Sequence, residues 1–482
     1  MRLPPDMRHP SSAFTNGRLR TRALAVAVGL AVAGCAVAPP YQAPSTPAPA
    51  AFKEAPTDGA LWLPAAPADA LERGDWWTLF GDAELDRLAG QVTVSNQNVA
   101  AAVAAYAQAQ ALVREQRAAL FPALTLDASA RRSGGRGSAS SGTALQASVG
   151  ASWEPDLWGR LRNSVEAASA GAAASAADLA AARLSAQAAL ALDYFSLREA
   201  DAEIELLRST VEGYQRSLQI TQNRYAVGVI AKTDVLQAET QLANTRADLA
   251  SLQGQRARFE HAIAVLIGKA PADFALTPAP WQSAVPAVPL GVPSALLQRR
   301  PDIAAAERDV AAANAQIGIE RSAYFPNLGL SGSLGSAGSR VADLFGASGS
   351  LWSLGVSVAQ TLFDAGATRA RVAGAEASRD AAIARYRQTV LSAFQSVEDQ
   401  LATTRVLVEQ EALRREASAA ADATEAQILN RYRAGQLSYT EVVTAQVSAL
   451  SARRALLQLA LSRQSSAISL IQALGGGWQA SP

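Results

Sequence analysis

Histidine, cysteine and methionine are almost absent from this sequence. Its 482 residues include two histidines, His9 and His261, one cysteine, Cys35, and two methionines, Met1 and Met7. A single cysteine forms no disulfide within the chain, and a zinc cluster of Cys and His is excluded. Catalysis by a Ser-His or Cys-His pair is close to excluded on the same count. We expect no enzyme activity, no metal site and no bound cofactor.

Aromatic residues and net charge are also scarce. Aromatic side chains make up 6% of the sequence, and 43 Lys and Arg against 42 Asp and Glu leave a formal charge of +1. This balance gives no reason to expect nucleic acid as a partner. Much of the 49% apolar content is alanine, which forms helix well and buries little area. The composition favours long, closely packed helices over one thick core.

The N-terminus has the pattern of a bacterial export signal. Arginines precede the run ALAVAVGLAVAGC (23–35), whose roughly a dozen apolar residues are too few to span a bilayer and suit a signal peptide. The ending VAGC resembles a lipobox, which implies cleavage before Cys35 and a covalent lipid there, and Ala36 resembles the outer-membrane sorting pattern. A soluble secreted protein with a stray cysteine is the alternative. We expect a signal peptide over 1–34 and a lipid-anchored, Pro-rich tether and equatorial segment over 35–73.

One unit is written twice in the chain. NRYAVG at 223–228 recurs as NRYRAG at 430–435, and Phe-Pro at 121–122 recurs at 325–326. Each half reads as helix, strand, loop, strand, very long helix, turn and helix. We therefore expect a tandem duplication, with a first repeat over 74–270, an equatorial linker over 271–292, a second repeat over 293–476 and a C-terminal tail over 477–482.

Helical periodicity and local stop signals set the expected elements. The longest helices reach roughly 100 Å at 1.5 Å per residue, which suits a coiled coil or an envelope-spanning rod. Few large apolar residues favour a curved wall one helix thick around a wet interior, and a bundle with a solid core is the alternative. The expected helices cover 82–119 (with Asp82 as N-cap), 160–224, a return helix capped by Thr233 or Asp234 and ending near 267, 293–323, 367–431, and a last helix ending near 474; the expected strands cover 123–130, 144–153, 327–334 and 351–362.

The four expected strands alternate strictly between apolar and small polar residues. On the first, Leu124 and Leu126 share one face while Thr125 and Asp127 share the other. Strands of about ten residues with this pattern are typical of an outer-membrane barrel, and an antiparallel sheet with one wet face is the alternative. In hydrocarbon every backbone amide must be paired, and a barrel needs about eight strands. Four strands per chain therefore require an oligomer, and small polar inner faces favour an open trimer over a plugged dimer.

The sequence resembles the outer-membrane factor family of Gram-negative tripartite exporters, within the lipoprotein branch that works with resistance-nodulation-division (RND) pumps. The resemblance covers nearly the whole chain. The segments that carry it are GDWWTLFGDAELDRL (74–88), WEPDLWGRLR (153–162), LLQRRPDIAAAERDVAAANAQIGIERSAYFPNLGLSGSLG (296–335), QTLFDAG (360–366) and the paired RYxxG turns.

The resemblance implies an α+β fold in which a long α-helical barrel of coiled-coil hairpins continues into a transmembrane β-barrel. It implies a homotrimer with four strands per protomer, embedded in outer-membrane lipid and extending into the periplasm. Its partners would be a periplasmic adaptor protein and an inner-membrane RND-type pump. The chain would then be a passive exit duct for small molecules such as drugs or other toxic compounds. A lipid-anchored periplasmic coiled-coil scaffold without a pore is the alternative.

The resemblance also implies a periplasmic gate near the two interhelical turns. Carried over by residue, Asp234, Tyr432 and Glu441 correspond to gate positions, and Gly228 and Gly435 are the hinge turns. Some family members have Arg where this chain has Leu437, and a second Asp where it has Thr444. The polar links that hold the family's gate closed are therefore expected to be weaker here, or to be formed differently. For each carboxylate, the alternative is a helix N-terminal charge favoured by the helix dipole.

Overall fold

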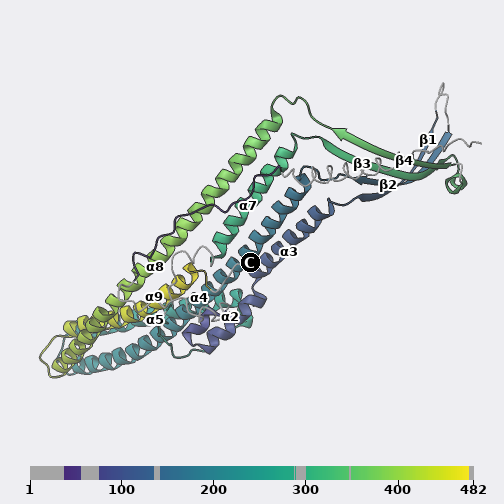
Figure 1. Ribbon diagram of the computed structural model, residues 1–482. Helices are drawn as coiled ribbons and strands as arrows, with labels where there is room; N and C mark the ends of the chain where they lie inside the picture. Colours follow the sequence, from purple (N-terminus) through teal and green to yellow (C-terminus); the bar gives the residue numbers. More distant parts are fainter. Residues whose placement is uncertain are drawn as a thin grey trace, which may run out of the picture. The chain divides into compact units, whose positions relative to one another are not determined.

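The computed structural model describes residues 37–55, 75–134, 142–286, 288, 300–346 and 349–476 (Figure 1). The predicted signal peptide, the lipidation residue Cys35 and the tail 477–482 lie outside these residues. The chain is mostly helical with one four-stranded sheet, and it divides into two compact units. The first comprises residues 1–43, 109–172 and 308–383; the second comprises 44–108, 173–307 and 384–482.

The first unit contains the whole sheet. All neighbouring strands are antiparallel, in the order β1-β2-β3-β4 (Figure 1). The pairing of β2 with β3 joins the two halves of the sequence. The strands are β1 (Ala123–Ser133), β2 (Gly142–Trp153), β3 (Asn327–Gly338) and β4 (Ser350–Ala359). The predicted strands are confirmed, although β1, β2 and β3 extend two to four residues further than expected and β4 ends at Ala359, three residues before the predicted end.

The helices follow the same series in both halves. The long helices α4 and α8 each contain 67 residues, and the return helices α5 and α9 each contain 35. Among the described residues, no helix is both long and apolar enough to cross a membrane. The helix bounds are α2 (Ala83–Ser95), α3 (Gln97–Ala118), α4 (Arg160–Ala226), α5 (Lys232–Leu266), α7 (Pro301–Ser322), α8 (Ala367–Arg433) and α9 (Tyr439–Ala473).

Two helix predictions need correction. The single helix expected over 82–119 is two helices, because Asn96 interrupts it: Oδ1 of Asn96 accepts from the amides of Asn98 and Val99 and so caps α3. The N-cap of α5 is Ala231, not Thr233 or Asp234, and it makes no side-chain cap bond. The helix begins at Lys232, directly after Ala231. The expected start at 293 of the fourth predicted helix lies outside the described residues, and α7 begins at Pro301.

The hydrophobic core of the second unit gathers around the start of α2. A short 3₁₀ helix, η2 (Trp76–Phe80), buries its aromatic side chains against α4, where the rings of Phe80 and Phe195 lie 5.0 Å apart. Asp82 caps α2 as predicted, since its Oδ1 accepts from the amides of Glu84 and Leu85. Its Oδ2 accepts from the Tyr194 hydroxyl at 2.7 Å. This cap therefore also ties α2 to α4.

Candidate functional site

The two interhelical turns have the same backbone structure. Gly228 and Gly435 adopt positive φ angles of 77° and 75°. In each turn the glycine amide donates to a carbonyl three residues earlier, and the next amide donates to one five residues earlier. This is the Schellman arrangement, which ends a helix and favours glycine because a Cβ is strained at positive φ. The predicted turns are therefore well-defined helix ends.

Arg224 links the two turns. It lies in the last turn of α4, yet its guanidinium donates to the carbonyls of Tyr432 (3.0 Å) and Arg433 (2.7 Å) at the end of α8. Its central carbon also lies 4.7 Å from the centre of the Tyr432 ring. A cation at a helix C-terminus is favourable because the last carbonyls carry partial negative charge, and the ring face adds a cation–π contact. Arg224 therefore holds the two helical hairpins together near their ends.

Tyr432 belongs to a small buried cluster next to this contact. Its ring packs edge-on against Tyr439 at 5.5 Å, and Ala238 and Val442 complete the buried set. Burial raises the pKa of Tyr439 to about 12, with the neighbouring Tyr432, Tyr214 and Asp234 adding to the effect. The hydroxyl oxygen of Tyr432 is buried and has no hydrogen-bond partner among the described residues. The cluster fixes the starts of α5 and α9 against the end of α8.

The two acidic residues that were predicted for the gate have different surroundings. Glu441 makes a local capping box: its Oε2 accepts from the amide of Ser438 at 2.9 Å and from its hydroxyl at 3.2 Å. Asp234 is a half-buried residue in the first turn of α5. Both positions are favourable for a negative charge at a helix N-terminus. Within one chain, the structure places Asp234 close enough to Tyr439, the neighbour of Tyr432, to affect its pKa, and it engages Glu441 in a cap.

Sequence reasoning missed Arg224 as a site residue. It was visible as the first arginine of the repeated NRYxxG motif, but its partner lies 208 residues away in the sequence. This chain has Leu437 where some family members have an arginine. Arg224 supplies a cationic contact close to Tyr432 from a different position in the chain. The repeat itself was the only sequence signal for this contact.

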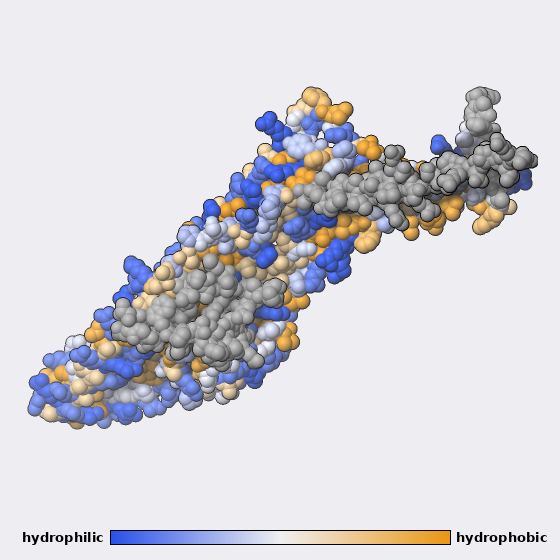
Figure 2. Space-filling view, viewed as in Figure 1, coloured by the Kyte–Doolittle hydropathy of each residue, from blue (hydrophilic) through white to orange (hydrophobic). Residues whose placement is uncertain are grey.

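The sheet presents a second candidate surface, and the strand register confirms its two faces. Residues directly opposite one another share a face, and Leu126 on β1 faces Val149, which faces Leu334, which faces Trp352. The apolar side chains of this face are widely exposed. The exposed set includes Leu124, Leu126, Val149, Trp153, Leu334, Trp352, Leu354, Val356 and Val358. Figure 2 shows apolar residues gathered along the strands.

The opposite face is small, polar and crowded. Ser333 and Ser353 hydroxyls lie 2.8 Å apart across β3 and β4. A Cβ added at Gly335 on this face would lie 2.6 Å from the Cβ of Ser148, whereas one at Gly332 on the apolar face would have no neighbour nearer than 3.7 Å. Glycine within a strand marks a bend or a close approach. The polar face is therefore the tighter side of the sheet.

Aromatic side chains anchor the places where strands meet helices in the first unit. The Trp158 ring stacks on Phe325 with centroids 4.7 Å apart, and its Nε1 donates to the Pro326 carbonyl at 2.7 Å. Nearby, Glu154 pairs with Arg160, and Asp156 accepts from the first amides of α4. These carboxylates are thus structural. Within the described ranges, no group of three or more His, Cys, Asp and Glu is placed to hold a metal ion.

Comparisons with known proteins agree with this geometry. The family model described as "Outer membrane efflux protein" matches residues 88–269 and again 292–476. The cation efflux system protein CusC of Escherichia coli O6:H1 is 31% identical over 94% of this chain and 98% of its own length. The antibiotic efflux pump outer membrane protein ArpC of Pseudomonas putida is 32% identical over 92% and 93%. The solved structure of the outer-membrane channel OprN has a TM-score of 0.83 and 32% identity, covering 92% of this chain and all of that one.

The chain belongs to the outer membrane efflux protein family. The resemblance stated from the sequence is thereby confirmed, and so is the localisation in the outer membrane of a Gram-negative bacterium with extension into the periplasm. Members of this family are channel proteins, not enzymes. The prediction that the chain has no enzyme activity is confirmed on that basis.

Proposed function

We propose that three copies of this chain form a passive exit duct through the outer membrane for small molecules. The observation that carries the proposal is the sheet: four strands with one exposed apolar face, one polar face, and outer strands β1 and β4 that have no further partner among the described residues. In hydrocarbon each unpaired backbone amide costs several kcal/mol, so the sheet must close on other chains. Three copies give a twelve-stranded barrel, with the crowded polar face turned inward.

The helices of the same three chains would form the periplasmic α-barrel. The equal lengths of α4 and α8, and of α5 and α9, support a tandem duplication, as does the double match of the family model. The proposed division is a first repeat over 74–270, an equatorial linker over 271–292 and a second repeat over 293–476. A lipid on Cys35, after removal of 1–34, would anchor each chain in the outer membrane.

The turns at Gly228 and Gly435 would lie at the periplasmic end and act as the hinges of a gate. Asp234, Tyr432 and Glu441 would lie at this gate, with Tyr432 buried behind its lining and Arg224 holding the two hairpins of each chain together. Because Arg224 makes its contacts within one chain, the hairpins would move as a pair. Opening would then be a shear of these pairs past their neighbours, driven by an adaptor protein and an inner-membrane RND-type pump.

The cargo would be chemically varied. Relatives of this chain are named for the export of cations, antibiotics, solvents and pyoverdine, which supports a duct of one architecture that passes varied compounds. We propose that the duct selects by size and charge, while the pump selects the compound. The energy for export would come from the pump.

Conductance in planar bilayers tests this function. The purified full-length protein is added to one side of the membrane, and single-channel current is recorded with and without the adaptor. A duct gives discrete current steps, and its gate predicts that the adaptor raises their size or frequency. A pore-free scaffold gives no steps under either condition, and that result would refute the proposal.

A further inference from the structure

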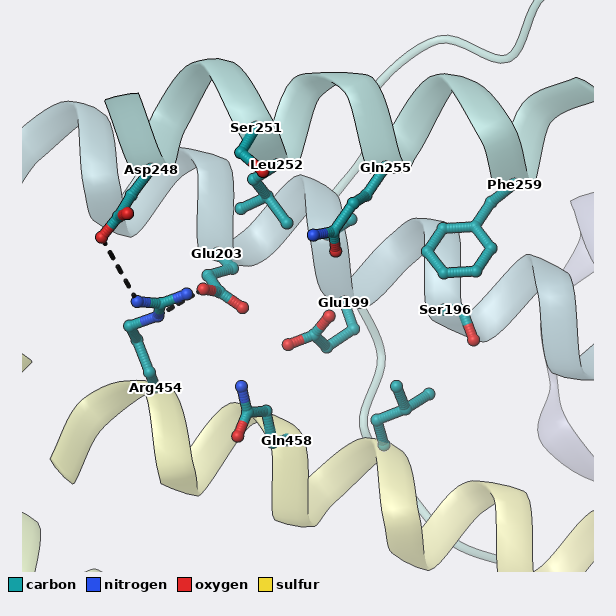
Figure 3. Close-up of a pocket in the computed structure, with 12 residues that line it drawn as sticks. Ser196, Glu199, Glu203, Asp248, Ser251, Leu252, Gln255, Phe259, Arg454 and Gln458 are labelled. Carbon is teal, nitrogen blue, oxygen red and sulfur yellow. Dashed lines mark hydrogen bonds and ion pairs between the residues drawn. The ribbon is translucent and has the colours of Figure 1, made fainter. Parts of the chain in front are cut away.

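A cavity in the second unit contains a carboxylate that the proposed duct function does not use. It has a volume of about 280 Å³ and lies between α4, α5 and α9 (Figure 3). Ligand pockets generally measure roughly 300–1,000 Å³, so this one suits a molecule of about one ring. Its wall includes the carboxylates of Glu199 and Glu203 and the apolar side chains of Phe259, Leu252 and Leu461.

The charges around the cavity do not balance. From α4 come Glu199 and Glu203, from α5 comes Asp248, and from α9 comes only Arg454. Arg454 is already engaged, because its Nε donates to Glu203 and its Nη1 lies 3.6 Å from Asp248 (Figure 3). The remaining polar side chains at the wall are neutral amides and hydroxyls. The lining therefore contains one cation and three carboxylates. Arg454 pairs with Glu203 and Asp248, and no other lining residue carries a positive charge that could pair with Glu199.

Glu199 is the carboxyl group that lacks a cationic partner, although it shares a hydrogen bond with Glu203. Its side chain points into the cavity in Figure 3, the residue is only 7% exposed, and its Oε1 has no hydrogen-bond partner within the described part of the chain. A buried carboxylate without a donor is costly, so such groups are normally paired. Burial, together with the neighbouring Glu203 carboxylate, raises the pKa of Glu199 to about 7. The group is thus poised to accept a donor that carries positive charge.

We infer that this cavity binds a small organic ammonium ion, whose charged nitrogen pairs with Glu199 while its apolar body lies against Phe259 and Leu252. The apolar side chains in the wall favour an organic amine over a bare metal ion, and the described residues offer no set of ligands placed for a metal. A charge-assisted hydrogen bond in a partly dry site is among the stronger polar contacts. The aromatic ring adds an attraction for a nearby cation.

This inference goes beyond the proposed duct and does not depend on conduction. Binding is measured on the full-length protein in detergent by isothermal titration calorimetry with benzylamine hydrochloride at about pH 8, where Glu199 is ionised. Saturable binding of one benzylamine per chain is expected. Benzyl alcohol, which has the same ring but no charge, is expected to bind at least about tenfold more weakly, since the ion pair contributes most of the discrimination.

Substitution locates the site. Glu199→Gln keeps the shape of the side chain and is expected to weaken benzylamine binding at least about tenfold. Glu205→Gln is the matched control, because Glu205 lies on the same helix with its side chain 77% exposed and is not part of the cavity wall. Its affinity for benzylamine should equal that of the unaltered protein. Thermal unfolding and elution volume establish that both variants are folded.

The pH dependence provides a second arm that needs no variant. Lowering the pH from about 8 to about 5.5 protonates Glu199 while benzylamine stays charged, so binding should weaken. No saturable binding at pH 8, equal binding of benzyl alcohol, equal binding by Glu199→Gln, or displacement of benzylamine by equimolar Mg²⁺ would each overturn the inference. Bilayer conductance tests the duct separately, so the two failures are distinguishable.

Discussion

At the scale of single residues, Arg224 is the contact on which the arrangement of the two turns depends. Replacing it with Gln removes the charge at the end of α8 and the contact with the Tyr432 ring. Hydrogen bonds to charged groups contribute roughly 1.5–3 kcal/mol, and partial exposure of Arg224 places the expected loss near the lower end. We expect faster hydrogen exchange in residues 428–442 and, in the assembled protein, more frequent channel openings. Hydrogen–deuterium exchange with mass spectrometry measures the first effect, and bilayer recording measures the second.

The matched control for this prediction is Arg216→Gln on the same helix. Arg216 makes only an exposed ion pair with Glu212 at 3.9 Å, which contributes about 0–1 kcal/mol. Exchange near the turns should not change in this variant. Equal exchange in both variants would mean that Arg224 does not hold the hairpins together.

Glu199 makes the stability of the helical unit depend on pH. Its pKa is raised to about 7 in the folded chain, above the value of an exposed glutamate. The stabilisation associated with the protonated form is therefore complete below about pH 4.5 and is lost as the pH rises through about 7. A shift of this size corresponds to roughly 3–4 kcal/mol at most.

The expected result is that opening of α4 and α9, measured by hydrogen exchange without added amine, becomes easier between pH 5 and pH 8. Glu199→Gln should remove much of this slope, because the amide does not ionise. Glu205→Gln should keep it. A slope that is unchanged in Glu199→Gln would place its origin in another group.

Residues whose partners are close in sequence were the predictable ones. Asp82 was predicted as an N-cap, and it accepts from amides two and three residues later. Arg224 was not predicted as a contact, since its acceptors lie in the other half of the sequence. The same is true of Glu199, whose burial depends on three helices packing together. Local propensity determines a cap, whereas a cross-helix contact requires knowledge of the packing.

At the scale of secondary-structure elements, β3 offers a direct test of which face is inside. Gly335→Ala places a methyl group against backbone and Cβ atoms of β2, within 2.6 Å, so the strands must shift. Overpacking of this kind costs roughly 1–3 kcal/mol. Gly332→Ala on the opposite face meets only ordinary contacts. We expect Gly335→Ala alone to lower the temperature at which heated protein loses its oligomeric band on a gel. Equal loss in the two variants would contradict a tighter polar face.

The helices and strands were predictable because apolar residues recur at different spacings in the two kinds of element. Apolar residues alternate in the strands and recur every three or four residues in the helices, so α4, α8 and all four strands were placed within a few residues of their observed ends. The break between α2 and α3 was not predicted. Its cause is Asn96, whose Nδ2 donates to the Leu266 carbonyl at 2.8 Å, 170 residues along the chain. A tertiary contact stabilises a break that the local sequence does not require.

At the scale of the whole molecule, the sheet is incomplete within one chain. The outer strands β1 and β4 have no further strand beside them among the described residues, and the apolar face is exposed along all four strands. An exposed edge of this kind pairs readily with another chain. A ring in which β1 of each protomer pairs with β4 of the next closes without leaving an edge. The number of copies in that ring is still to be determined, and the twelve strands that we propose correspond to three copies of four strands each.

Disulfide crosslinking between edge strands counts the copies. Thr125→Cys on β1 is combined in turn with a cysteine at position 353, 355 or 357 on β4, all on the polar face. Where two cysteines come within about 4.4–6.8 Å between Cα atoms, mild oxidation joins them. Non-reducing gels should then show dimers and trimers with no larger species, whereas each single-cysteine variant should stay monomeric.

The matched control pairs two strands of the same chain. Ser333 and Ser353 lie opposite each other on β3 and β4, so their double cysteine variant should form a disulfide within the chain and migrate as a monomer. A ladder that continues beyond three copies would indicate an open assembly, and the absence of any edge crosslink would separate the sheet from a barrel. A ladder that stops at three requires a closed ring, because an open chain of heterologous contacts has no reason to stop there.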